Sequence, residues 1–122
     1  MQEISRFELA GDVRVMRTGK TETGGVALEE SVAGTSCLVA YGEPARRARL
    51  SFDSAMLAGL CHALGRDGGA STDDALAALS DFARQEENEL VDLMDLCDAR
   101  GVAYAYLALG DSSGMSYRPA RS

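Results

Sequence analysis

Hydrophobic and polar residues alternate along the first half of the chain, and the alternation is interrupted by turn-forming residues. In residues 45–52, ARRARLSF, Leu50 and Phe52 fall on one side while Arg47 and Arg49 fall on the other. A period of two is typical of an antiparallel strand with one buried face. The same pattern, read between turn signals such as Ala-Gly-Asp, predicts five strands before the helices and one after them. These strands are expected at residues 3–9, 13–18, 26–32, 35–41, 45–52 and 101–109.

The second half has a helical period instead. Apolar residues recur every three or four positions in 54–64, which predicts a short helix with Asp53 as its N-cap. The S-x-x-D sequence from Ser71 to Asp74 is typical of a helix start, and we expect a long helix over about 73–99.

The element order β-β-β-β-β-α-α-β predicts an α+β fold. We expect a two-layer sandwich in which an antiparallel sheet of five to six strands is covered on one face by two helices. A chain of 122 residues fits one domain. We place this domain at 1–110, followed by a flexible C-terminal tail at 111–122.

The middle of the predicted long helix lacks the continuous apolar stripe of an ordinary surface helix. Glu86 and Glu87 flank the apolar stripe, where burial of a carboxylate without a partner is costly. Either the helix breaks near 85–88, or its middle runs past the edge of the sheet. A straight helix over this span would be about 40 Å long, so both alternatives leave an acidic, partly apolar surface exposed.

The net charge of −7 is concentrated on this segment, because residues 71–101 hold nine acids and two bases. Such a surface repels a phosphate backbone, which argues against direct binding of nucleic acid. The sequence has no run of about 18 apolar residues and no signal-peptide pattern at its start, so we expect no membrane association. The three cysteines are an odd number and lie far apart, which is typical of reduced thiols in a cytoplasmic protein.

These features predict a small non-catalytic protein that binds or regulates a partner through the acidic helix. Carboxylates three or four residues apart lie about 5–6 Å from each other on a helix, close to the scale of phosphate spacing in a nucleic-acid strand. The protein could therefore be an inhibitor that docks on a basic, nucleic-acid-binding partner protein. The candidate partner-binding residues are Asp81, Glu86, Glu87, Glu89, Asp92, Asp95 and Asp98.

Two other interpretations of the acidic helix stay open. It could be a solvated face that keeps the protein dissolved. It could also mediate self-association, in which the acidic helix of one copy meets a basic strand of another in a homodimer or larger structural assembly. The basic residues for this are Arg46, Arg47 and Arg49.

Motifs for catalysis are incomplete. Gly19-Lys20-Thr21 resembles the end of a P-loop, but Arg14 stands where the motif needs its first glycine. Residues 110–114, GDSSG, contain serines, but a nucleophilic serine needs a base and the only histidine is His62. We expect no enzyme, and the remaining alternative is a small enzyme that uses His62 with a thiol or carboxylate.

Metal and cofactor sites are not predicted either. Zinc ligands usually come in close pairs, whereas Cys37, Cys61, His62 and Cys97 are scattered and the adjacent Cys61 and His62 diverge on a helix. The acids at 73–74 and 86–89 would point outward from a regular helix instead of converging on Ca²⁺ or Mg²⁺.

Overall fold

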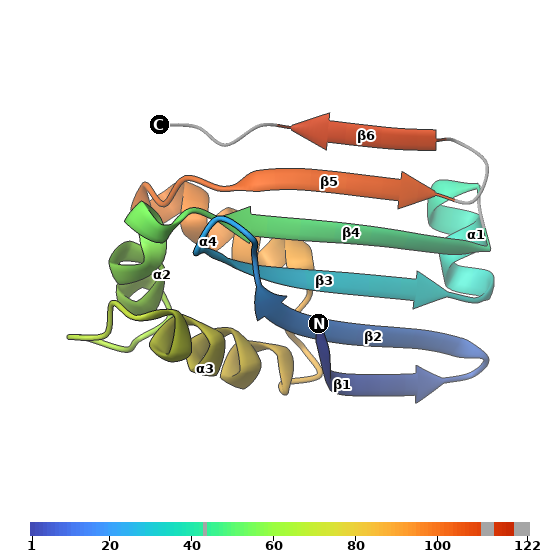
Figure 1. Ribbon diagram of the computed structural model, residues 1–122. Coiled ribbons are helices and arrows are strands. Elements are labelled where there is room, and N and C mark those ends of the chain that lie inside the picture. Colours follow the sequence, from blue (N-terminus) through green and yellow to red (C-terminus); the bar gives the residue numbers. More distant parts are fainter. Residues whose placement is uncertain (43, 111–113, 119–122) are drawn as a thin grey trace.

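The computed structural model describes residues 1–42, 44–110 and 114–118. Its centre is an antiparallel sheet of six strands in the order β1-β2-β3-β4-β5-β6 (Figure 1). The strands are β1 (Gln2–Leu9), β2 (Asp12–Lys20), β3 (Val26–Ala33), β4 (Ala45–Phe52), β5 (Ala105–Gly110) and β6 (Gly114–Arg118). The helices are α1 (Thr35–Tyr41), the 3₁₀ turn η1 (Ser54–Met56), α2 (Leu57–Ala63), α3 (Thr72–Ala83) and α4 (Leu90–Arg100).

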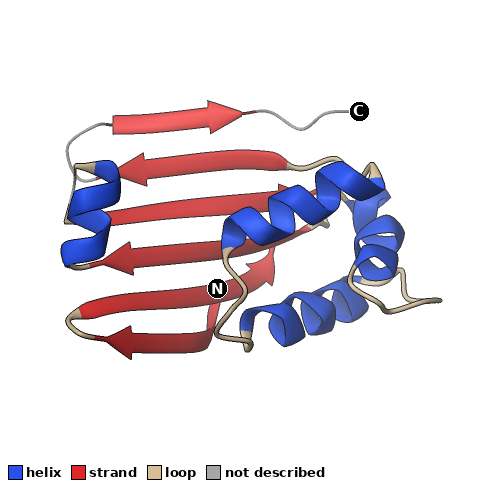
Figure 2. Ribbon diagram, turned by 180° about the vertical axis from the view of Figure 1, so that it is seen from behind, coloured by secondary structure: helices blue, strands red, loops and turns tan. Residues whose placement is uncertain are grey.

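The helices lie on one face of this sheet, which confirms the predicted α+β class and the antiparallel sheet (Figure 2). The alternation in β4 has the expected effect, because Leu50 and Phe52 are buried while Arg47 and Arg49 are exposed on the opposite face. The core combines large, fully buried side chains of both layers, among them Met16, Val26, Leu28, Leu50 and Phe52 from strands and Leu60, Leu79 and Leu93 from helices.

The strand predicted at 35–41 is wrong, since these residues form α1. β3 pairs directly with β4, beginning at Ala33 and Ala45, so the segment between them is a connection and has no place in the sheet. Gly34, with φ +123°, turns the chain out of β3, and Gly42, with φ +73°, ends the helix. The β-forming side chains of TSCLVAY are overridden by these two turns and by the strand pairing.

The single helix predicted at 73–99 is also wrong, because α3 and α4 are separate helices. The break lies at 84–89, which agrees with the first of the two alternatives drawn from Glu86 and Glu87. Asn88 stabilises the turn by donating a hydrogen bond to the carbonyl of Phe82, at 3.1 Å. Capping boxes begin both helices, Ser71 with Asp74 as predicted and Glu89 with Asp92.

The element boundaries after β4 also differ from the prediction. The helix expected at 54–64 begins as η1 and continues as α2, and the Asp53 side chain makes no capping hydrogen bond. The last predicted strand begins at Ala105 instead of 101. Residues 114–118 of the expected tail pair with β5 as β6, while 111–113 and 119–122 lie outside the described residues. The element order also differs from the predicted β-β-β-β-β-α-α-β. One helix, α1, lies between β3 and β4, and η1, α2, α3 and α4 lie between β4 and β5.

Replacing Gly34 by alanine should destabilise the protein more than the same change at Gly42. Both residues have positive φ, which costs a side chain about 1–2 kcal/mol. A Cβ at Gly34 would also collide with Asp12 Oδ1 and lie 2.6 Å from the Gly11 carbonyl oxygen, whereas nothing would lie within 4 Å of a Cβ at Gly42. Urea unfolding of both variants measures the difference, and equal losses of stability would contradict this account of the β3–α1 turn.

Candidate functional site

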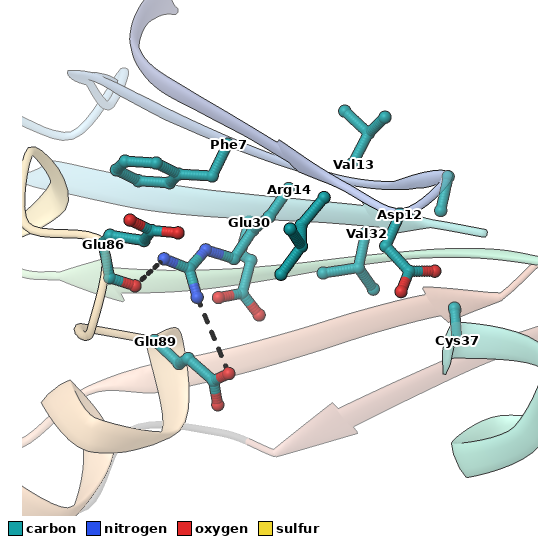
Figure 3. Close-up of a pocket in the computed structure, with 11 residues that line it drawn as sticks. Phe7, Asp12, Val13, Arg14, Glu30, Val32, Cys37, Glu86 and Glu89 are labelled. Carbon is teal, nitrogen blue, oxygen red and sulfur yellow. Dashed lines mark hydrogen bonds and ion pairs between the residues drawn. The ribbon is translucent and has the colours of Figure 1, made fainter. Parts of the chain in front are cut away.

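A groove runs across the helix side of the sheet between α1 and the turn that joins α3 to α4. Its volume is about 410 Å³, and strands β1 to β3 form its floor (Figure 3). Apolar side chains line it together with one arginine and four acids. Among the lining residues are Phe7, Arg14, Glu30, Val32, Glu86 and Glu89. The groove exists because the helices cover the sheet only in part.

Arg14 on β2 ties the α3–α4 turn to the sheet. Its guanidinium lies over the Phe7 ring, 5.0 Å from the centroid. It donates a hydrogen bond to the carbonyl of Glu86 and forms an ion pair with Glu89, with 3.6 Å between Nη1 and Oε1. Its side chain is only 15% exposed, and its buried Nε has no hydrogen-bond acceptor among the described residues. Arg14 therefore positions Glu86 and Glu89 at the rim of the groove.

Glu30 on β3 lies beside Arg14, and both side chains are on the helix side of the sheet (Figure 3). Its carboxylate accepts a hydrogen bond from the backbone N–H of Leu90, at 3.0 Å, in the first turn of α4. Burial raises the pKa of Glu30, and the Leu90 hydrogen bond and the charge of Arg14 only partly oppose this effect. Glu30 is thus a carboxylate held in a poorly solvated position.

The outward side of α4 carries the centre of the predicted acidic surface. Leu93 and Cys97 are buried against the sheet, while Asp92 and Asp95 are exposed on the other side of the helix. Glu87 in the turn and Asp95 form no ion pair in the part of the chain that the structure describes. Val91, 51% exposed, adds an apolar side chain to this acidic surface.

Two of the predicted site residues lie apart from this centre. Asp81 is on α3 and forms ion pairs with Arg66, at 2.7 Å, and Arg84, at 3.3 Å. The hydrogen bond from Arg66 lowers the pKa of Asp81. Asp98 accepts a hydrogen bond from the Tyr104 hydroxyl, at 2.9 Å, near the end of α4. We therefore define the acidic surface as Glu86, Glu87, Glu89, Asp92 and Asp95. Asp81 and Asp98 do not belong to it.

The three arginines considered for self-association do not share one face. Arg46 is on the helix side of β4 and donates to the Tyr106 hydroxyl, at 3.5 Å. Arg47 and Arg49 are on the open side, and Arg49 forms an ion pair of 2.8 Å with the buried carboxylate of Glu29.

The cysteines and the histidine are also separated. The three cysteines are buried and free, and burial raises the pKa of Cys97 to about 12, so its thiolate is scarce at neutral pH. His62 is exposed on α2 and pairs with Asp67. Among the described residues, no group of three or more histidine, cysteine or acidic side chains could hold a metal ion.

Sequence reasoning missed Arg14, Glu30 and the groove. Arg14 and Glu86 are 72 positions apart, and Glu30 and Leu90 are 60 apart, so local periodicity carries no sign of these contacts. One signal was present, because both charged residues occupy positions of strands whose neighbours two residues away are buried, Met16 and Leu28.

The fold and site define a class, an α+β domain with an open antiparallel sheet and an acidic groove on its helix side. Comparison with protein-family models, curated proteins and solved structures finds no match for the chain. Within the described ranges, no helix has the length and apolar character needed to span a membrane.

Replacing Glu30 by glutamine should raise the melting temperature at neutral pH. Because the pKa of Glu30 is raised above its ordinary value of 4.5, the folded protein holds this proton more tightly than the unfolded chain. Protonation of Glu30 therefore stabilises the folded state at pH values below the ordinary pKa. This stabilisation is lost as the pH rises through the pKa that Glu30 has in the folded protein. Glutamine keeps an acceptor for the Leu90 N–H but has no charge to desolvate.

Thermal unfolding followed by circular dichroism tests this at neutral pH and at a pH below the ordinary pKa of Glu30. The gain should vanish at the lower pH, where Glu30 is protonated in both states. A melting temperature at neutral pH that is unchanged or lower would contradict the destabilising role of this carboxylate.

Proposed function

We propose that the protein is a non-catalytic binding protein that docks on a basic surface of a partner protein through Glu86, Glu87, Glu89, Asp92 and Asp95. The observation that carries the proposal is the exposure of this set next to Val91, with Glu87 and Asp95 forming no ion pair among the described residues. An apolar side chain surrounded by carboxylates suits a partner that offers Lys or Arg together with apolar contact area.

The arrangement also favours a partner that itself binds nucleic acid. Asp92 and Asp95 are one helical turn apart on the same side of α4, and Glu89 precedes Asp92 by three residues. This row of negative charge is similar in scale to a phosphate backbone. An inhibitor of this kind would occupy the nucleic-acid site of its partner and be displaced by the nucleic acid.

Changing Glu87 and Asp95 together to lysine should weaken partner binding by at least about tenfold and leave the fold intact. Neither side chain forms an ion pair in the described structure. Asp92 is unsuitable for this test, because its carboxylate accepts the Glu89 N–H in the capping box. The partner is first captured with the unaltered protein and identified by mass spectrometry, and affinities are then measured with the purified partner.

The matched control changes Glu8 and Glu22 to lysine, which alters the net charge equally on β1 and in the β2–β3 loop, away from α4. Competition with duplex DNA for the partner tests the inhibitor hypothesis. A partner that binds the Glu87 and Asp95 variant as tightly as the control variant would exclude the acidic surface as the docking site.

Self-association is the second candidate, and the charge distribution favours one form of it. The acidic surface is on the helix side, whereas Arg47 and Arg49 are on the open side of the sheet. A two-fold dimer places the same patch of both copies at one interface, so the acidic surface could meet Arg47 and Arg49 only head to tail, in a ring or filament.

Light scattering at low and high salt separates the two candidates. If the acidic surface serves a partner, the mass should be that of one chain at both salt concentrations. Oligomers that dissociate in salt would instead indicate pairing of exposed charges between copies, which salt screens within about 10 Å at 0.1 M.

A further inference from the structure

The groove beside the acidic surface has its own chemistry. Four carboxylates line it, those of Asp12, Glu30, Glu86 and Glu89, against the single guanidinium of Arg14. Its volume of about 410 Å³ is within the range of about 300–1,000 Å³ that is typical of sites for small ligands. An occupant that suits this lining is positively charged.

Arg14 does not turn the groove into an anion site. Its two terminal nitrogens already contact Glu86 and Glu89, and the flat face of its guanidinium lies against the Phe7 ring. With four carboxylates and one guanidinium, the lining as a whole stays negatively charged. Glu30 uses one oxygen, Oε2, for the Leu90 N–H, and no second donor contacts its carboxylate in the described structure.

The apolar part of the lining sets the shape of the occupant. Val32 lies next to Glu30 on the floor, and Phe7 lies on the far side of Arg14 (Figure 3). Leu9, 75% exposed, lines the groove at the end of β1. A cation with an aliphatic stem could pack its methylene groups on these side chains and place its head among the carboxylates. A small, strongly hydrated metal ion would gain nothing from the apolar floor.

We infer that the groove receives a lysine or arginine side chain of the basic partner. This inference rests on the proposed function, because it takes the occupant from the same partner surface that contacts α4. Glu86 and Glu89 belong to both sites, so a basic segment that crosses α4 reaches the groove without a gap. Burial disfavours the charge of Glu30, and Arg14 opposes this effect only in part. A second cation in the groove would supply the missing counter-charge.

The test is a titration of the isotope-labelled protein with hexaarginine, followed by nuclear magnetic resonance. Hexaarginine should shift the amide signals of Val32, which lines the groove, and of Leu90, whose N–H donates to Glu30. Replacing Glu30 by glutamine should weaken this binding by at least about tenfold. The matched control replaces Glu29 by glutamine, because Glu29 is the neighbouring residue on β3 but faces the opposite side of the sheet.

The outcomes separate this inference from the proposed function. The Glu87 and Asp95 lysine variant should lose partner binding but still show the shifts at Val32 and Leu90. Shifts confined to residues 91–100 of α4, or equal affinities of the Glu30 and Glu29 variants, would overturn the groove site and leave the docking surface standing. Groove shifts together with undiminished partner binding by the Glu87 and Asp95 variant would overturn the docking surface and leave the groove site standing.

Discussion

The hydrogen bond from the Leu90 N–H to the carboxylate of Glu30 lies where the covered part of the sheet ends, and the helical layer depends on it. The first N–H groups of a helix lack intrahelical acceptors and carry partial positive charge. Glu30 supplies one acceptor from the sheet, and the Glu89–Asp92 box supplies others. The start of α4 is therefore fixed to β3, and from that point the helix can follow the apolar part of the sheet.

The same contact explains why the groove exists. Along β3, Val26 and Leu28 face the helices as apolar residues, but the next residue on this side is Glu30. Along β2, Met16 is followed on the same side by Arg14. Charged side chains at these positions cannot be covered by the apolar side of a helix without loss of their solvation. The helical layer ends there, α3 and α4 are separated by a turn, and the sheet beyond it stays open as far as α1.

Much of the sheet and the start of α3 could be predicted from the sequence, because they depend on local patterns. The alternation in β4 and the Ser71 to Asp74 capping box are examples. The helical structure of 35–41 could not be predicted, since the side chains of TSCLVAY favour strands. Its conformation depends on the pairing of β3 with β4, which leaves this segment outside the sheet. The acidic segment could be predicted from the sequence, but not which of its residues belong to the exposed surface and which pair with other parts of the fold. Whether Asp81 belongs with Glu87 depends on Arg66 and on the break in the helix, and both are features of tertiary structure.

The acidic residues differ in whether another residue of the fold pairs with them. Asp81 and Asp98 have partners supplied by the fold, and Glu89 has Arg14. Glu87 and Asp95 form no ion pair with any described residue, and Val91 between them is half exposed. The adjoining groove adds a poorly solvated carboxylate, that of Glu30. The basic, partly apolar partner that we propose would compensate all three features at once, since it would neutralise the acids, cover the valine and bring a counter-charge to Glu30.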